Sequence, residues 1–213
     1  AATSARELTV PMVSIRDGLL LELAAIVSGR AGSDFTSQIL ASARALGEKY
    51  SYDEKHALHV TKLALALFDE LRHEEHQLGN RERLMLQVAG ILHDIGVFIG
   101  NTAHHKHSRY LVSQSEIFGL RKAEKDLIAE IVRYHRKATP QPTHIEYMSL
   151  PRADRVVVSK LAAILRVADA LDRAHSQRVK DVRFERRKDA FVIHVPGVED
   201  LAVERSGLSA KGD

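Results

Sequence analysis

Apolar residues recur at helical spacing along most of the chain, from about residue 33 to about residue 178. The clearest stripe follows the intervals i, i+3, i+4 and i+7, at Val60, Leu63, Ala64, Leu67, Phe68 and Leu71. Similar patterns predict helices near residues 39–46, 84–92, 127–132 and 157–171, and a further helix that starts at Ser108. Between residues 84 and 92 apolar side chains would lie on nearly every face of the helix, which is typical of a central, buried helix. We therefore expect a mainly α fold, a helical bundle around one core.

Helix start signals refine these boundaries. Ser51 and Glu54 have the spacing of a capping box, which makes Ser51 the expected N-cap of the clearest helix. Asn80 is the expected N-cap of the central helix. Ser149 together with Pro151 is expected to open the last long helix.

The two ends of the chain differ from the helical middle. Residues 8–14 are expected to form a short edge strand interrupted by proline, followed by a short helix to about residue 27 and a linker at 28–33. After Gln177 the apolar period changes to two, which predicts a β-hairpin around residues 187–189 and a third strand at 201–203. The chain begins without an initiator Met or a signal-peptide pattern, so we expect it to be a piece of a longer protein.

Composition narrows the class of protein. The 213 residues are 45% hydrophobic, which is enough to bury a real core, and no run of 18 apolar residues indicates a membrane span. There is no Cys, which excludes disulfides and thiolate metal sites and favours a cytoplasmic origin. The net charge of +3 permits anionic ligands but does not demand nucleic acid. We expect no membrane partner and no specific nucleic-acid partner.

The candidate chemistry centres on His93 and Asp94, adjacent residues at the end of the central helix. Successive helical residues point about 100° apart, so the pair presents two ligands on neighbouring faces. An ionised Asp at the end of a buried helix also needs a partner. His56 lies on the buried stripe of the clearest helix, His135 follows an apolar helix, and Asp169 lies at the edge of the last apolar face. Any one of these histidines alone would more often be a packed core residue than a ligand.

Together these groups predict a polynuclear metal site. His56, His93, Asp94 and Asp169 would hold a first ion, and His107 and His135 a second, with Asp94 placed to bridge and with His93 and Asp94 as the catalytic centre. Imidazole and carboxylate ligands suit one or two divalent ions of Mn, Mg, Fe, Zn or Co. Two such ions suit the hydrolysis of phosphate esters.

Other histidines and the basic residues leave alternatives open. His107 is preferred as a ligand because it directly precedes the expected helix start at Ser108, whereas His104 and His105 belong equally well to a solvated polar loop. The remaining histidines are expected to be surface or structural: His73, His76, His144, His175 and His194. Several basic residues near the site would bind phosphate oxygens of the substrate, or would simply be solvated at a helix end: Lys106, Arg109, Arg133, Arg136 and Lys137.

The same residues resemble a known superfamily. His56, the run His93-Asp94-Ile95-Gly96, His107-Ser108, His135 and Asp169 are similar to the motifs of the HD superfamily of metal-dependent phosphohydrolases. More narrowly, the chain from about Leu8 to its end resembles the C-terminal half of the Ppx/GppA family of exopolyphosphatases and guanosine pentaphosphate phosphohydrolases. The stretches that carry this narrower resemblance are residues 15–20, 67–71, 104–108 and 132–137.

The resemblance implies a division into three parts. Residues 1–32 would be a remnant of an actin-like, ribonuclease H-like phosphatase domain, 33–178 a helical HD domain, and 179–213 a partial C-terminal α/β segment with β structure. In the family, polyphosphate and guanosine pentaphosphate are hydrolysed in the cleft of the actin-like domains, and the HD-like domain often lacks intact ligands and contributes to dimerisation and polyphosphate binding. This chain departs from that pattern because it keeps the ligand set.

Two functions are therefore consistent with the sequence. The first is an HD-type metal-dependent phosphohydrolase that acts on phosphate esters or phosphoanhydrides, with polyphosphate or a nucleotide as substrate. The second is a non-catalytic module that binds polyphosphate along a basic groove and dimerises. A homodimer is expected in either case.

Overall fold

The computed structural model describes residues 31–137, 139–188 and 190–209 and confirms the mainly α fold. In chain order the helical elements are α2 (Ala31–Lys49), α3 (Glu54–Leu71), the π-helix η1 (Arg72–His76), α4 (Asn80–Leu92), the 3-10 helix η2 (Ile95–Phe98), α5 (His104–Gln114), α6 (Lys122–Arg133), α7 (Ile145–Met148), α8 (Arg152–Leu171) and α9 (Ala202–Ser209). The strands are β1 (Arg183–Arg187) and β2 (Ala190–His194). Contacts divide the chain into two units, residues 1–38 and 39–213, and the candidate site described below lies entirely in the second.

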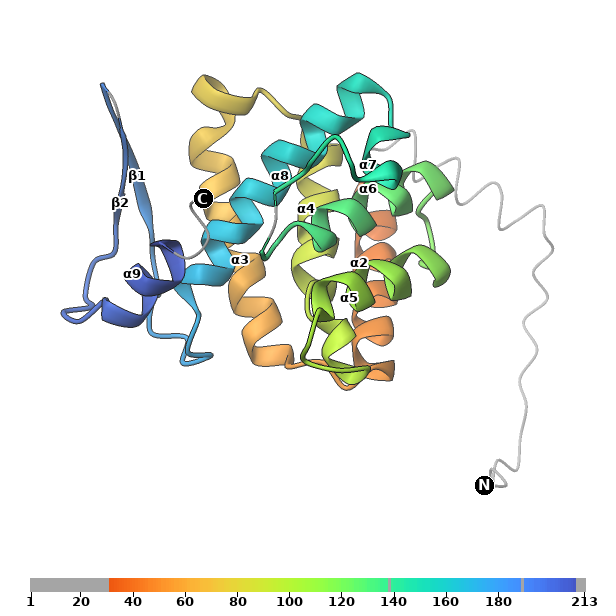
Figure 1. The fold of residues 1–213 in the computed structure, drawn as a ribbon, viewed down its shortest axis with the longest axis horizontal. Helices are drawn as coiled ribbons and strands as arrows, with labels where there is room; N and C mark the ends of the chain where they lie inside the picture. Colours follow the sequence, from red (N-terminus) through yellow and green to blue (C-terminus); the bar gives the residue numbers. More distant parts are fainter. Residues whose placement is uncertain (1–30, 138, 189, 210–213) are drawn as a thin grey trace. The chain divides into compact units, whose positions relative to one another are not determined.

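The central helix is α4, as its sequence predicted. It packs against α3, α6 and α8 (Figure 1), and every residue from Leu84 to Leu92 is buried except Gln87. The predicted stripe of α3 is buried from Val60 to Phe68, and Leu71 at its end is half-buried. Among the described residues, no helix combines the length and the apolar character needed to cross a membrane.

Two predicted helix starts were wrong by one or two residues. The N-cap of α3 is Asp53, whose Oδ1 accepts a hydrogen bond from the amide of His56 at 3.1 Å. Ser51 has a φ of 49°, in the left-handed region, whereas an N-cap residue usually takes an extended conformation. The N-cap of α4 is Gly79 rather than Asn80, and the amide of Gly79 donates to Glu82 Oε2 at 2.8 Å.

The predicted hairpin is confirmed, and the predicted third strand was wrong. Strands β1 and β2 pair antiparallel, with Phe184 opposite Ile193. Residues 202–209 form the helix α9 instead of a strand, and the amide of Ala202 donates to Asp200 Oδ1 at 2.9 Å. This capping contact favours a helix over a strand, and Gly207 lies close against Ala170 of α8.

Predictions made for the first thirty residues, including the edge strand and the short helix, lie outside the described residues. Helix α2 begins at Ala31, inside the stretch 28–33 that was expected to be a linker. The three expected domain boundaries stay predictions.

Gly96 allows the turn after α4 to approach the start of α5 closely. Its amide donates to Ser108 Oγ at 2.8 Å. A Cβ at this position would lie 2.2 Å from the carbonyl oxygen of His104 and 2.3 Å from the amide nitrogen of Ser108. Because these are backbone atoms, an added methyl group would force the start of α5 away from the turn.

We therefore expect Gly96→Ala to lower the free energy of unfolding by about 3 kcal/mol or more, the upper range for overpacking a core. The matched control is Gly100→Ala, where an added Cβ would meet no atom within 4 Å. That substitution should change stability by no more than about 0.5 kcal/mol. Urea unfolding followed by circular dichroism measures both, and equal stability of the two variants would refute the role given to Gly96.

A candidate metal centre

The candidate site lies where the ends of five helices meet. His56 is in the first turn of α3, and His93 and Asp94 follow directly after α4. The other contributors are His104 at the start of α5, His135 just after α6 and Asp169 in the last turn of α8. Residues that are far apart in the sequence thus meet because α3, α6 and α8 pack against α4, while α5 packs against α6 and η2.

Three of the histidines are oriented by the local backbone. The ring nitrogen Nδ1 lies close to the carbonyl oxygen three residues earlier in each case: 2.8 Å in His93, 2.9 Å in His104 and 2.6 Å in His135. A carbonyl only accepts, so each Nδ1 carries a proton and Nε2 is the nitrogen left to bind a metal ion. Metal-ligating histidines almost always have such a partner on the other nitrogen.

His56 is oriented by a carboxylate instead. Its Nδ1 lies 2.9 Å from Asp172 Oδ2, and the side chain of Asp172 is only 1% exposed. Its Nε2 is therefore also directed into the site, 3.3 Å from His93 Nε2 and 3.4 Å from Asp169 Oδ1.

The inward-facing atoms form two groups that Asp94 joins. The ligand atoms of His56, His93 and Asp169 lie within 4.8 Å of one another, as do those of Asp94, His104 and His135. Asp94 Oδ1 is 3.3 Å from Nε2 of both His104 and His135, whereas Asp94 Oδ2 is 3.7 Å from His93 Nε2. Oδ1 of Asp94 thus faces the group of His104 and His135, and Oδ2 faces the group that contains His93.

These residues fit a pair of metal ions. Two donor atoms that share a tetrahedral ion at about 2.1 Å lie about 3.4 Å apart, close to the distances found here. In addition, Asp94 Oδ1, His104 Nε2 and His135 Nε2 are buried and make no hydrogen bond within the described part of the chain. Leaving buried polar atoms without partners costs about 1–3 kcal/mol each, and bound cations would satisfy all three.

The electrostatics of the site favour cations. Burial lowers the pKa of His56, but hydrogen bonds to Asp169 and Asp172 outweigh burial and raise it to about 9. Burial also opposes ionisation of Asp94, but the neighbouring His93 holds the pKa of this carboxyl below its usual range. Without metal, the positive charge that the carboxylates attract is held as protons on histidine, and metal binding would displace those protons.

Five of the six predicted ligands meet in the site, and His107 does not. His107 is half-buried and belongs to none of the ligand groups found among the described residues. The reason is that α5 begins at His104, four residues before the expected start at Ser108. His104 lies four residues before Ser108 and seven before Leu111, on the buried face of α5, so extending the apolar period backwards would have identified it.

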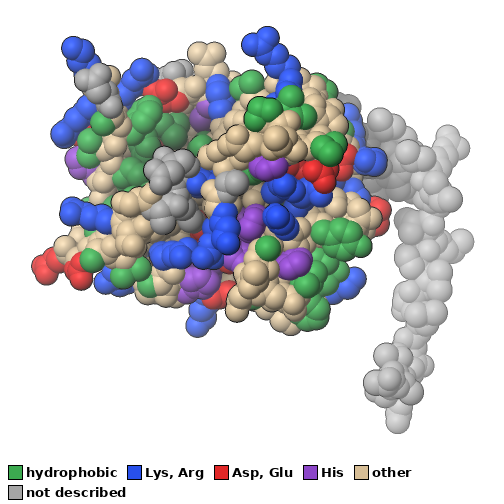
Figure 2. Space-filling model, in the orientation of Figure 1, with side chains coloured by type: hydrophobic (Ala, Val, Ile, Leu, Met, Phe, Trp, Pro, Cys, Tyr) green, Lys and Arg blue, Asp and Glu red, His purple; other side chains and the backbone are tan. Residues whose placement is uncertain are grey.

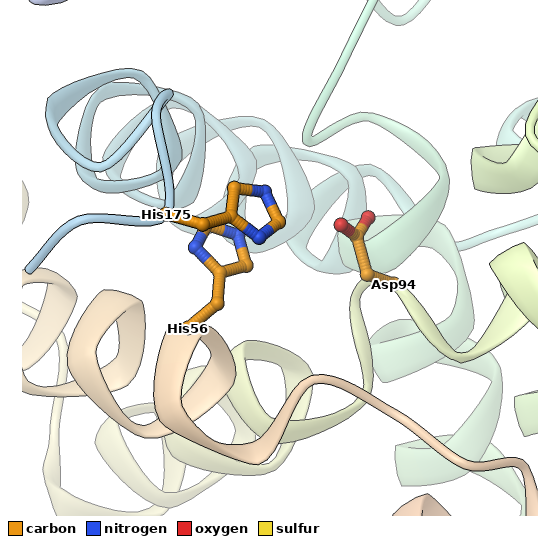
Figure 3. A group of neighbouring side chains, drawn as sticks. All are labelled: His56, Asp94 and His175. Atoms are coloured by element: carbon orange, nitrogen blue, oxygen red, sulfur yellow. The ribbon is translucent and has the colours of Figure 1, made fainter.

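Sequence reasoning also missed Asp172 and His175. Asp172 orients His56, and the ring of His175 stacks on that of His56 with centroids 3.6 Å apart. His175 was expected to be surface or structural, yet it forms a further group of ligand atoms with His56 and Asp94 (Figure 3). It lies in the irregular segment after α8, where no periodic signal was available.

The basic residues differ in how they are engaged. Arg109 donates to the buried Glu130 at 2.5 Å and lies 3.5 Å from Glu146, so its guanidinium is engaged by acidic partners. The side chains of Lys106, Arg136 and Lys137 make no ion pair within the described residues. Figure 2 shows a face on which histidine side chains lie among Lys and Arg side chains.

Comparison with known proteins agrees with this architecture. The family model for Ppx/GppA phosphatase, domain III, matches residues 40–201. A guanosine-5'-triphosphate,3'-diphosphate pyrophosphatase of Photobacterium profundum is 29% identical over 153 residues, which are 71% of this chain and 29% of that protein. The protein of the same name from Pseudoalteromonas atlantica is 31% identical over 124 residues, 56% of this chain and 24% of that protein.

The chain therefore spans less than a third of the length of these curated relatives. The match to the family model covers most of the chain and includes all the helices that build the candidate site. The chain belongs to the Ppx/GppA phosphatase family, and the matched region is its domain III.

Proposed function

We propose that this domain is an HD-type metal-dependent phosphohydrolase that acts on phosphate esters or phosphoanhydrides of a nucleotide or a polyphosphate. The observation that carries the proposal is the pair of ligand groups joined by Asp94, with three buried polar atoms that cations would satisfy. Such a ligand set differs from an ordinary polar core, in which buried polar atoms are paired with one another.

Each residue has a definite part in this chemistry. Divalent cations, when bound, supply Lewis-acid activation of water and of phosphoryl oxygens. His56, His93 and Asp169 would hold the first cation and His104 and His135 the second. The carboxylate of Asp94 would hold both and fix the spacing between them.

The substrate phosphate would approach over the basic residues beside the second group. Lys106 and Lys137 are exposed, and Arg136 is half-buried. Burial lowers the pKa of His105 to about 4, and the nearby side chains of His135 and His104, together with the charged Lys137 and Lys106, lower it further. This positive potential favours a phosphate over a neutral substrate. Arg109, which is engaged by Glu130, would contribute indirectly by fixing α5 against α6.

The alternative is a polyphosphate-binding and dimerising module without catalysis. The exposed cations Lys106 and Lys137, which make no ion pair within the described part of the chain, support binding of a polyanion equally well. The two functions differ in what removal of Asp94 does, because binding along a basic surface does not need a bridging carboxylate.

Metal content tests the ligand assignment. The wild-type protein, purified without chelators and loaded with Mn²⁺ or Zn²⁺, should hold about two equivalents by elemental analysis. His104→Ala should hold about one, because it removes a ligand from the second group only. His107→Ala is the matched control from the same helix and should retain about two. Full occupancy in His104→Ala with loss in His107→Ala would reverse the assignment made here.

Activity tests the catalytic proposal. We expect hydrolysis of some member of a panel of phosphomonoesters, phosphodiesters, nucleotides and inorganic polyphosphate, and we expect Asp94→Asn to lower it more than about 100-fold. Lys106→Ala should raise KM about tenfold, the effect of losing one charge-assisted hydrogen bond. Lys188→Ala, at the exposed hairpin turn, should have no effect.

Two outcomes would decide between the functions. Hydrolysis that Asp94→Asn leaves unchanged would exclude this site as its source. No hydrolysis, together with salt-sensitive polyphosphate binding that Lys106→Ala weakens, would favour the binding module.

A further inference from the structure

His175 covers the imidazole of His56 on the side of the site that faces solvent. The two rings lie parallel, with an interplanar angle of 5° and centroids 3.6 Å apart. The side chain of His56 is 1% exposed, whereas that of His175 is 45% exposed. Figure 3 shows the two rings face to face, with the carboxylate of Asp94 beside them.

The position of His175 is held by several contacts. Its Nδ1 lies 2.9 Å from Oδ2 of Asp53, the N-cap of α3, and its amide donates to the carbonyl of Asp172 at 2.8 Å. Gln177 binds both carboxylate oxygens of Asp172, at 2.7 Å and 3.2 Å. The segment is therefore built around the same Asp172 that orients His56.

The backbone of this segment adopts an unfavourable conformation. His175 and Gln177 both have a φ of 51°, in the left-handed region that non-glycine residues rarely occupy. Such conformations persist where surrounding contacts impose them, and they cluster at functional sites.

The stacked geometry argues against His175 as an additional ligand to the same ion. An imidazole binds a metal through a lone pair that lies in the plane of the ring. The lone pairs of two parallel rings lie in separate parallel planes and do not converge on one point. His56 Nε2 faces His93 and Asp169, so His56 is the residue placed to bind the first ion. His175 contacts the ring of His56 and does not take its place as a ligand.

We propose that His175 is a positioning residue that clamps the ring of His56 and retains the ion at the first metal position. This inference rests on the proposed metal-dependent function. Asp172 fixes which nitrogen of His56 carries the proton, and His175 fixes the plane of the ring and excludes water from its face. Ligand rotation is a step in metal loss, so a clamped ligand should release its ion slowly.

The test is the rate at which excess EDTA removes Co²⁺ from the loaded protein, followed by the visible absorbance of the bound ion. His175→Ala should release one of the ions about tenfold faster or more, because loss of a contact that orients a ligand typically costs 10–100-fold in metal affinity. His175→Phe keeps the stacked ring and should stay near the wild-type rate. His107→Ala, outside the ligand groups, should also match the wild type.

Asp53→Asn provides a second, independent variant. Asparagine is a good N-cap, so its Oδ1 keeps the contact to the amide of His56, but the NH2 that replaces Oδ2 is a donor and cannot accept from His175 Nδ1. We expect an increase in the release rate smaller than that of His175→Ala. Unfolding midpoints of the metal-free proteins should agree for all variants, which separates metal retention from general stability.

Equal release rates for wild type and His175→Ala would overturn the inference, as would a His175→Phe variant as fast as His175→Ala. Should His175→Ala fail to fold, the rates of His175→Phe and Asp53→Asn decide by the same criteria. A wild-type protein that takes up no Co²⁺ would refute the proposed function and the inference with it, whereas uptake with equal rates refutes the inference alone.

Discussion

The whole site depends on which nitrogen of each histidine carries the proton. In His93, His104 and His135 the acceptor is the carbonyl three residues earlier, and in His56 it is the carboxylate of Asp172. Interior helical carbonyls accept from backbone amides, but those at helix ends and in turns are left without a partner in the helix. The ends of the helices therefore supply acceptors where the ligands are needed, and each Nε2 faces a carboxylate of the site.

The sequence predicted most of the helical framework because burial imposes a period that can be counted. The central position of α4 and the pairing of β1 with β2 followed from that period alone. Predictions made from capping chemistry were less accurate. Ser51 and Asp53 are both good N-cap residues two positions apart, and α4 is capped by Gly79, which ranks below the neighbouring Asn80 as an N-cap residue. His104 was missed because α5 begins a turn earlier than the apolar run suggests, and no periodic pattern points to His175.

Backbone strain in the described residues is concentrated beside the site. Apart from Gln77, each non-glycine residue with a positive φ lies at or within two residues of a side chain that builds or supports the site. The residues concerned are Ser51, Ala103, Lys137, His175 and Gln177. Each such conformation costs on the order of 1–3 kcal/mol, so the fold is locally less stable where the ligands are held.

The convergence of five helix ends on one centre also determines how the protein would lose its structure. No single segment contains a complete ligand group, because the ligands come from α3, the turn after α4, α5, the end of α6 and α8. An ion that binds only this assembled state stabilises it by mass action, because the unfolded chain has no complete site to bind the ion. Bound cations would therefore cross-link distant segments of the folded chain. Because this cross-link would form last during folding and break first during unfolding, it would lower the unfolding rate without raising the folding rate.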